Sequence, residues 1–208
     1  MKERSVLFWD FDGVIKESVE VKTAAYVKLF APFGAAVAER VREHHERNGG
    51  MSRFDKLPLY LQWARQPASD DEVQRYCDAF SGAVFQAVID APWVPGAREY
   101  LQRHHARQRF VQITATPQDE IERILAALQI SSWFREVHGA PTAKAEAVAA
   151  VLARWGCEPD AALVIGDADA DYRAAAANGV EFLLRRTPLN LALQREHAGR
   201  QCEHFLDE

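Results

Sequence analysis

Two aspartates after an apolar segment are the first residues of the sequence whose types and spacing suggest chemistry. Asp10 and Asp12 flank Phe11 directly after the apolar run at 6–9, and Gly13 follows them. Because side chains alternate along a strand, two aspartates separated by one residue lie on the same side of the chain. Gly13 alone is enough to turn the chain, so the aspartates are not needed to end the strand. Their spacing predicts paired carboxylates at the rim of a sheet.

Polar residues also follow three later segments of the chain. Thr114 ends the stretch FVQIT, Lys144 lies near the start of a helical pattern, and LVIGDADADY supplies Asp167, Asp169 and Asp171. In a parallel sheet these segment ends converge on one edge, where ligands bind. Partly desolvated carboxylates at that edge repel one another unless a cation lies among them. Oxygen ligands at this density favour Mg²⁺, which also accepts phosphate oxygens.

Each of these groups suits one part of a phosphoryl transfer. We expect Asp10 to attack phosphorus as the nucleophile, because a metal-bound carboxylate lies close to a phosphate that shares the metal. Asp12 is expected to protonate the leaving alkoxide and later to deprotonate the water that hydrolyses the aspartyl phosphate. The Thr114 hydroxyl and the Ala115 backbone N–H are expected to bind phosphate oxygens. Lys144 is expected to neutralise both the phosphate and the Asp10 carboxylate.

Simpler interpretations exist for several of these residues. Thr114 is also an ordinary β-branched strand residue, and a lysine such as Lys144 is usually solvated on a helix surface. Asp167 and Asp171 are also compatible with helix capping alone, and Asp169 is expected only to favour a helix N-terminus.

The residues that follow the Thr114 segment have the pattern of a helix start. Thr116 is typical of an N-cap, Pro117 of the first helical position and Asp119 of a capping-box acid. We expect the dipole of that helix to favour an anion beside it.

The order and spacing of these motifs resemble the haloacid dehalogenase superfamily, specifically its phosphatases with a helical cap inserted after the first strand, in the phosphoglycolate phosphatase-like and beta-phosphoglucomutase-like subgroup. The resemblance covers essentially the whole chain. Its matching stretches are DFDGV at 10–14, Thr114, Lys144 and GDADAD at 166–171.

The resemblance implies a role for each matching residue. Asp10 is implied to be the nucleophile, Asp12 the general acid and base, and Thr114 and Lys144 the phosphate ligands. The implied metal ligands are Asp10, Asp167, Asp171 and the backbone carbonyl of Asp12. Val14 and Ala168 stand where many family phosphatases have threonine and serine, and both are tolerated variants.

The aspartate at position 12 also separates the chain from other branches of that superfamily. Family dehalogenases lack this second aspartate and use no metal, and the phosphonate-cleaving members replace it. Asp12 therefore argues against cleavage of carbon–halogen or carbon–phosphorus bonds.

Strand and helix patterns alternate along most of the chain. Residues 1–12, 110–114, 162–166 and 180–184 have the pattern of strands, and 138–140 could add a short strand or loop. Helical patterns cover 118–129, 142–155 and 169–178, the last ended by Gly179. This alternation predicts an α/β fold with a doubly wound, Rossmann-like parallel sheet.

Residues 16–92 have a different pattern, with four helical segments and no convincing strand. The segments are 19–30, 36–48, 53–65 and 70–89, and prolines and a glycine at 92–96 mark the exit. We therefore expect a core of residues 1–15 and 93–208 and a helical cap of residues 16–92. Residues 13–18 and 91–96 are the expected hinges.

The expected cap contains one candidate substrate ligand. Arg53 follows a glycine-rich break at 48–50 and could reach a leaving group held below it, although a surface arginine needs no such role. The paired histidines His44 and His45, and His104 and His105, are expected to be exposed helix residues, because adjacent residues on a helix face different directions.

Composition excludes several classes of protein. The 208 residues are 48% hydrophobic with a formal net charge of -5, so we expect neither nucleic acid nor a membrane as a partner. The N-terminal apolar run is too short for a signal peptide or a membrane span, which favours a cytoplasmic protein. Cys77, Cys157 and Cys202 form no disulfide or zinc pattern. The expected state is a monomer or small homo-oligomer.

The sequence thus predicts a Mg²⁺-dependent phosphatase that hydrolyses a small phosphorylated metabolite through an aspartyl phosphate. A phosphomutase of the beta-phosphoglucomutase type shares the same motifs and remains an alternative. A non-catalytic metabolite-binding protein with the same fold is a second alternative. Phosphoglycolate-like acids and sugar phosphates are all compatible substrates.

Overall fold

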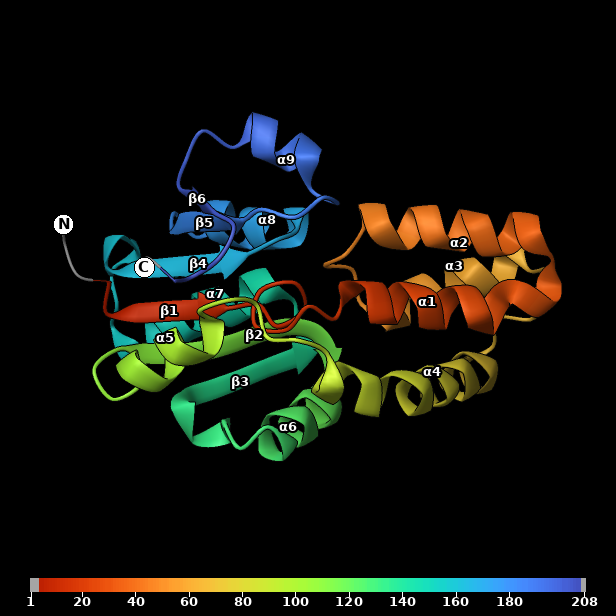
Figure 1. The fold of residues 1–208 in the computed structure, drawn as a ribbon, viewed down its shortest axis with the longest axis horizontal. Coiled ribbons are helices and arrows are strands. Elements are labelled where there is room, and N and C mark those ends of the chain that lie inside the picture. Colours follow the sequence, from red (N-terminus) through yellow and green to blue (C-terminus); the bar gives the residue numbers. More distant parts are fainter. Residues whose placement is uncertain (1–3, 207–208) are drawn as a thin grey trace.

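A parallel sheet covered by helices forms one part of the molecule, and four further helices extend beyond one end of that sheet (Figure 1). The computed structural model describes residues 4–206. The strands are β1 (Val6–Trp9), β2 (Arg109–Pro117), β3 (Phe134–Ala140), β4 (Ala162–Gly166), β5 (Glu181–Arg185) and β6 (Gln201–Cys202). The α-helices are α1 (Val19–Phe30), α2 (Ala35–Arg47), α3 (Arg53–Trp63), α4 (Asp70–Asp90), α5 (Ala97–His104), α6 (Gln118–Ala127), α7 (Lys144–Trp155), α8 (Asp169–Ala177) and α9 (Leu191–Glu196).

The sheet confirms the predicted α/β architecture. Its strands are all parallel in the order β3-β2-β1-β4-β5-β6, so β1 lies in the interior between β2 and β4. Phe8 of β1 pairs with Val111 on one side and Val164 on the other. Helices α5 and α9 and strand β6 lie outside the sequence predictions, and β3 is longer than the expected strand at 138–140. The carboxyl ends of β1, β2 and β4 meet at one edge, as a doubly wound sheet requires.

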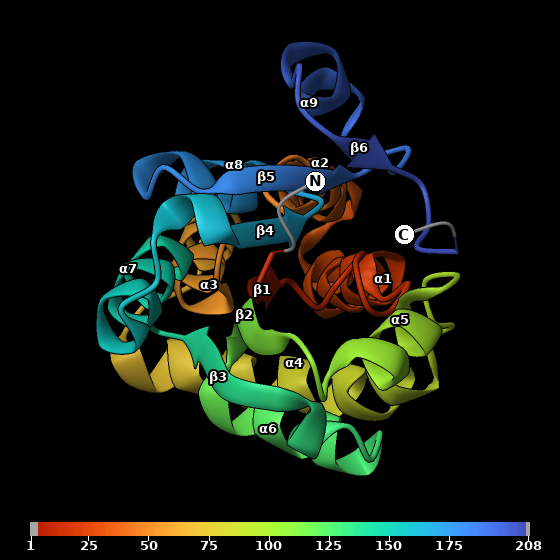
Figure 2. The same ribbon diagram turned by 90° about the vertical axis from the view of Figure 1, so that its left-hand side faces the viewer.

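Both faces of the sheet are buried, which explains the continuous apolar run of β1. Val6 and Phe8 pack in one apolar cluster with residues of α7 and α8, whereas Leu7 and Trp9 pack in another with residues of α5 and α6. Figure 2 shows these two pairs of helices on opposite sides of the sheet. The sheet is therefore a rigid support for side chains at its edge.

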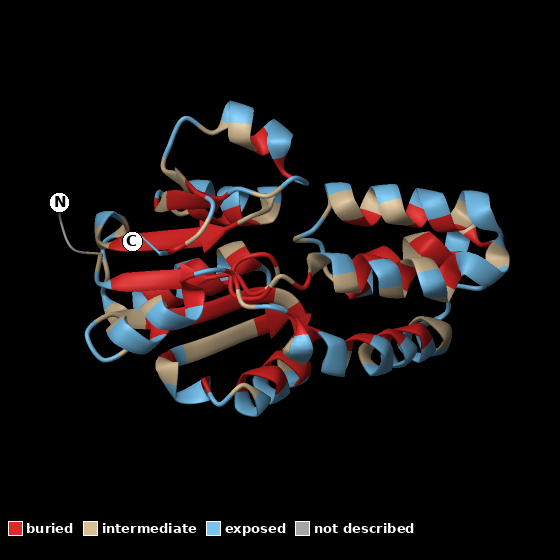
Figure 3. Cartoon of the chain, viewed as in Figure 1, coloured by how far each residue is buried: buried red, intermediate tan, exposed pale blue. Residues whose placement is uncertain are grey.

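Helices α1, α2, α3 and α4 pack together around aromatic side chains. The Tyr26 and Phe80 rings stack at 3.9 Å, and Tyr60 meets both Tyr26 and Phe30 edge-on. The buried faces of these helices point inward, and their exposed faces point to solvent (Figure 3). Their bounds agree within two residues with those predicted from sequence. No helix in residues 4–206 combines the length and apolarity needed to cross a membrane.

The chain passes between the sheet and the four helices twice, and the two crossings contact each other. The Val94 N–H donates to the Ile15 carbonyl at 3.0 Å, and the Glu17 N–H donates to the Pro92 carbonyl at 2.9 Å. Lys16 is buried, and its ammonium donates to the Ile89 carbonyl at 2.9 Å. The entry and exit of the helical insertion thus form one hydrogen-bonded connection.

Candidate active site

Asp10 is the first residue beyond β1 and is held in the protein interior. Its backbone N–H donates to the carbonyl of Ile165 at 2.9 Å, and the residue is only 5% exposed. The Lys144 ammonium lies 2.8 Å from the Asp10 carboxylate. Burial raises the pKa of Asp10 to about 7; Lys144 opposes this rise, and Asp171 and Asp12 add to it. Asp10 is therefore a buried carboxylate whose charge Lys144 does not fully compensate.

Two glycines allow the acidic side chains to approach the strand ends. Gly13 has a φ of +75°, and a Cβ there would lie 2.2 Å from a carboxylate oxygen of Asp167. A Cβ on Gly166 would lie 2.2 Å from the Cβ of Asp171. A side chain at either position would collide with an aspartate, so both positions require glycine.

The structure brings three predicted site residues into one acidic cluster. Carboxylate oxygens of Asp10, Asp167 and Asp171 all lie within 4.8 Å of one another. The Lys144 ammonium contacts Asp10 at 2.8 Å and Asp171 at 2.7 Å. Burial raises the pKa of Asp167 well above its usual value, and the neighbouring Asp10 and Asp171 raise it further.

Asp171 combines two of the roles considered from sequence. One carboxylate oxygen accepts a hydrogen bond from the Ala168 N–H at 3.2 Å, as a helix-capping residue would, while the other contacts Lys144. Asp169 lies apart from this cluster: it is exposed, and its carboxylate pairs with Arg173 at 3.1 Å.

The Asp12 carboxylate is held by polar groups from the segment that precedes α1, from α1 itself and from β2. The Ser18 hydroxyl donates to its carboxylate at 2.6 Å, the Lys22 ammonium forms an ion pair with it, and the Thr116 hydroxyl lies 3.4 Å away. Burial alone would raise the pKa of Asp12. Lys22 and Ser18 outweigh burial, so this pKa lies below its usual value and the carboxylate is ionised.

The segment around Thr114 corrects two expectations. Strand β2 continues to Pro117, so Thr114 lies within the strand, and α6 begins only at Gln118. Thr116 is not the N-cap of α6; its hydroxyl accepts a hydrogen bond from Lys22 at 2.8 Å. The Thr114 hydroxyl accepts a hydrogen bond from the Thr116 N–H at 3.2 Å. Thr114 and Ala115 both line a cavity between the strand ends and the four helices.

Arg53 lines the same cavity, but its guanidinium is engaged with the core. It lies at the start of α3 and pairs with both carboxylate oxygens of Glu120 on α6, at 2.7 and 2.6 Å. Ser81 of α4 also donates to Glu120 at 2.6 Å. The guanidinium therefore joins the helical group to the core, in place of the free approach to a leaving group expected from sequence.

The paired histidines on α2 also differ from expectation, because they are not exposed. His45 is only 4% exposed, and its Nδ1 lies 2.9 Å from the buried Lys56 ammonium. Half-buried His44 contacts the Tyr60 hydroxyl through Nδ1 at 3.0 Å. The helical spacing of Ala38, Val41 and His45 puts His45 on the face of α2 that packs against α1 and α3, a signal that the comparison of adjacent residues overlooked.

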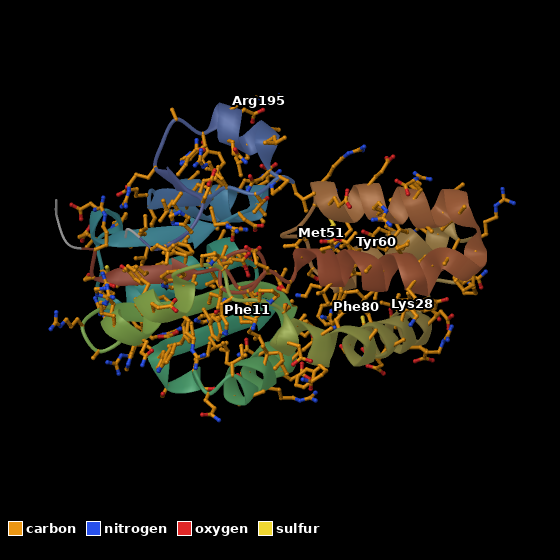
Figure 4. The ribbon with its side chains drawn as sticks, viewed as in Figure 1. Phe11, Lys28, Met51, Tyr60, Phe80 and Arg195 are labelled. Atoms are coloured by element: carbon orange, nitrogen blue, oxygen red, sulfur yellow. The ribbon has the colours of Figure 1, made fainter. Side chains whose placement is uncertain are left out.

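These side chains surround a cavity of about 210 Å³ between the strand ends and the four helices. From the core it is lined by Asp10, Asp12, Thr114, Ala115, Lys144 and Asp167. From the helical group it is lined by Lys22, His45, Met51, Arg53, Lys56 and Phe80. In Figure 4 Met51 and Phe80 lie at the end of the helical group that faces the core. A small molecule in the cavity would contact both parts of the protein.

The sequence reasoning gave Thr116 a different role and missed three other polar residues that contact this region. They are Lys22, Glu120 and Asn190, whose side-chain amide donates to the Asp167 carbonyl at 2.7 Å. Lys22 carried a usable signal, since it lies between Val19 and Tyr26 at helical spacing, on the face that the helix buries. Asn190 carried none, because its contact depends on the path of the chain after β5.

Comparison with known proteins agrees with this geometry. The family model for haloacid dehalogenase-like hydrolases matches residues 5–179. The chain belongs to this family. A search of curated protein sequences found no significant match. The family match identifies the protein as a hydrolase, and the acidic cluster lies within the matched residues.

Solved structures of low sequence identity share the fold. A CbbY variant from Rhodobacter sphaeroides in complex with xylulose-(1,5)bisphosphate has a TM-score of 0.77 at 15% identity, over 98% of this chain and 95% of that one. A "putative phosphoglycolate phosphatase" from Lactobacillus plantarum has a TM-score of 0.74 at 16% identity, over 99% and 97%. A "putative beta-phosphoglucomutase" from Thermotoga maritima has a TM-score of 0.69 at 19% identity, over 95% and 94%.

Proposed function

We propose that this hydrolase is a Mg²⁺-dependent phosphatase that hydrolyses a small phosphorylated metabolite through an aspartyl phosphate on Asp10. The observation that carries the proposal is the placement of Asp10, which contacts Lys144, belongs to the acidic cluster and lines the cavity. A carboxylate in this position can approach the phosphorus of a phosphate bound in the cavity, where Lys144 and a metal ion would offset the negative charge.

The donor set fits a hard divalent cation. Buried Asp10 and Asp171 share the Lys144 ammonium, and half-buried Asp167 belongs to the same cluster; burial and the repulsion between these carboxylates raise the pKa of Asp10 and of Asp167. Asp10, Asp167, Asp171 and the backbone carbonyl of Asp12 would hold the ion, with only oxygen ligands, as Mg²⁺ prefers. When bound, Mg²⁺ supplies positive charge that offsets repulsion between the carboxylates and a phosphate.

The proposed reaction proceeds in two displacements at phosphorus. An Asp10 oxygen forms a bond to phosphorus while the bond to the alcohol oxygen breaks, and Asp12 gives that oxygen a proton. Asp12 then takes a proton from water, whose oxygen displaces the Asp10 oxygen and releases inorganic phosphate. Thr114, the Ala115 N–H and Lys144 would bind the phosphate oxygens throughout.

Lys22 suits the second displacement in particular. Its ion pair with Asp12 favours the ionised carboxylate, which is the form that accepts a proton from water. For the first displacement this ion pair must loosen so that Asp12 carries a proton. A phosphate dianion that enters the cavity attracts the Lys22 ammonium, and this attraction would loosen the ion pair with Asp12.

Residues 16–92 would act as a cap that excludes water from the cavity and contributes to substrate selectivity. The contacts that support this are the ion pair of Arg53 with Glu120 and the ion pair of Lys22 with Asp12, each of which joins the helical group to the core. Arg53 would then position the cap, with no direct bond to the leaving group.

The experiment that tests the proposal is hydrolysis of p-nitrophenyl phosphate with and without MgCl₂. Asp10→Asn should abolish turnover, and excess EDTA should do the same to the parent protein. Asp119→Asn, an exposed aspartate on α6, is the matched control and should retain turnover. Full turnover by the Asp10→Asn variant would overturn the assignment of the nucleophile.

A phosphomutase is the second candidate, because a structure of that description shares the fold. Both reactions use the same phosphorylated carboxylate and differ in whether water or a second hydroxyl accepts the phosphoryl group. Hexose phosphates distinguish them: release of inorganic phosphate supports the phosphatase, and an isomeric hexose phosphate without release supports the mutase.

A further inference from the structure

Lys16 is a buried lysine that the proposed reaction does not use. It lies in the connection between β1 and α1, is 2% exposed and does not line the cavity. Its ammonium donates to the Ile89 carbonyl at 2.9 Å and lies 4.8 Å from the centre of the Trp93 ring. Because burial of an ammonium costs free energy, an uncharged residue would be favoured at this position unless the contacts of the charge matter.

The carbonyl that Lys16 contacts belongs to the end of α4. Ile89 lies in the last turn of that helix, where carbonyls lack a partner within the helix and a positive charge is favourable. The last turn of α4 has no basic residue of its own, so Lys16 caps the helix from outside it. Helix α4 carries Phe80, which lines the cavity, and Ser81, which donates to Glu120 of the core. The ammonium therefore holds a helix that forms part of the cavity wall.

The backbone of Lys16 belongs to the loop that carries Asp12. Its N–H donates to the Phe11 carbonyl at 3.1 Å, and its carbonyl accepts from the Gly13 N–H at 2.8 Å. The Ser18 hydroxyl, which donates to the Asp12 carboxylate, lies 3.4 Å from the same carbonyl. A shift of Lys16 would therefore move the residues on both sides of Asp12 and the hydroxyl that holds its carboxylate.

We propose that Lys16 is a positioning residue that couples the placement of α4 to the placement of the Asp12 carboxylate. This inference rests on the proposed phosphatase function, in which Asp12 gives a proton to the leaving oxygen. The hydrogen bond to the last turn of α4 fixes Lys16, and Lys16 in turn fixes the loop that brings Asp12 to that oxygen. Without the ammonium the helix and the loop move independently, and proton donation loses the alignment on which its rate depends.

Two aryl phosphates test the inference, because they differ in how much they need a proton from Asp12. The p-nitrophenolate ion leaves readily without a proton, whereas phenolate is the stronger base and gains more from one. The measurement is kcat/KM in MgCl₂ for p-nitrophenyl phosphate and for phenyl phosphate, expressed as the ratio of the first to the second. Lys16→Met keeps a long side chain without the ammonium and should raise this ratio about tenfold, through a selective loss with phenyl phosphate. An unchanged ratio would overturn the inference even if both rates fall, since a merely structural role lowers both alike.

Matched variants assign the effect to the ammonium of Lys16. Arg98→Met removes the exposed guanidinium that lies 5.4 Å from the centre of the same Trp93 ring, and it should keep the ratio of the parent protein. Lys16→Arg keeps a cationic donor and should restore much of the lost turnover of phenyl phosphate. Thermal unfolding checks that each variant is folded; if Lys16→Met is not, Lys16→Gln, which is uncharged and one bond shorter, should raise the ratio in its place. A raised ratio in Arg98→Met, or a ratio in Lys16→Arg as high as in Lys16→Met, would contradict the role of the ammonium.

Turnover by the parent protein separates this inference from the proposed function. If the parent protein hydrolyses both esters and Lys16→Met leaves their ratio unchanged, the positioning role is refuted and the phosphatase stands. If the parent protein hydrolyses only p-nitrophenyl phosphate, Asp12 does not protonate the leaving oxygen, and the inference fails while the phosphatase stands. Hydrolysis of neither ester would refute the phosphatase itself.

Discussion

Arg53 and Glu120 form a two-point ion pair, at 2.6 and 2.7 Å, between the first turn of α3 and the first turn of α6. Both side chains are almost completely buried, at 3% and 4% exposure. The guanidinium also lies 4.7 Å from the centre of the Phe80 ring. A charged pair with this burial stabilises the contact between the helices and the core only while both members are present.

Replacement of Glu120 by glutamine should therefore be costly. An unpaired buried guanidinium destabilises a protein by about 3–5 kcal/mol, and we expect a loss of this order in the free energy of unfolding by urea. Glu122→Gln, an exposed neighbour on the same helix, is the control and should cost less than about 0.5 kcal/mol. A loss in the Glu120 variant no larger than in its control would contradict the role given to the pair.

The same pair should make stability depend on pH in acid. Burial opposes ionisation of Glu120, but Arg53 and Ser81 outweigh it and hold the folded-state pKa below its ordinary value. Such a group stabilises the fold above its unfolded-state pKa, about 4.3, and the contribution is lost as pH falls through the folded-state value. The difference in stability between the parent protein and Glu120→Gln should therefore shrink below about pH 4. A constant difference would exclude this linkage.

Mg²⁺ should stabilise the protein more in neutral than in acidic solution. The pKa of Asp10 is raised to about 7, so without metal its contribution to stability is lost as pH rises through that value. At neutral pH a bound cation takes the place of the proton and offsets this loss of stability. In acid the cation must first displace the proton, so it stabilises the protein less. Thermal unfolding with and without MgCl₂, at about pH 5.5 and about pH 7.5, measures both shifts. Asp10→Asn should reduce the difference between them, and equal shifts in the parent protein would contradict the expectation.

Lys22→Met should move the acidic limb of the kcat profile to higher pH. Lys22 is the largest of the influences that lower the pKa of Asp12, so its removal raises that pKa. As pH falls, Asp12 is then protonated at a higher pH and ceases to act as a base there. The measurement is kcat against pH with a saturating aryl phosphate. Lys28→Met removes an exposed charge from the same helix and should leave the limb in place; an unmoved limb in Lys22→Met would rule out this role.

Gly13→Ala should disturb the metal site as well as the turn. A Cβ at Gly13 would lie 2.2 Å from Asp167, so the carboxylate must move, and Mg²⁺-dependent turnover should fall at least about tenfold. Gly156→Ala is the control, because Gly156 has a φ of +56° with nothing within 4 Å of the added Cβ. It should lose stability, about 1 kcal/mol, without loss of turnover. Equal turnover in the two variants would show that Asp167 tolerates the displacement.

The sequence predicted those features of the protein that depend on local spacing. The parallel sheet followed from alternating apolar and helical segments, and α1 begins and ends at the predicted residues. The meeting of Asp10, Asp167 and Asp171 followed from a topological rule, because strand ends of a doubly wound sheet share an edge.

Features that depend on distant contacts could not be predicted in the same way. The pairing of Arg53 with Glu120 arises from how α3 packs on α6, which no local pattern encodes. The helix start expected at Thr116 failed for a related reason: pairing with β3 extends β2 to Pro117, and tertiary hydrogen bonds outweigh local capping preference.

The hydrogen bonds between Ile15 and Val94 and between Glu17 and Pro92 bring the two ends of residues 18–91 together. A segment whose ends meet can be exchanged as one block, since a replacement of any length need only span the same short gap. Because the cavity is lined from both parts of the protein, exchange of this segment would change only the part of the lining that the helices supply and would leave the strands that hold Asp10 in place.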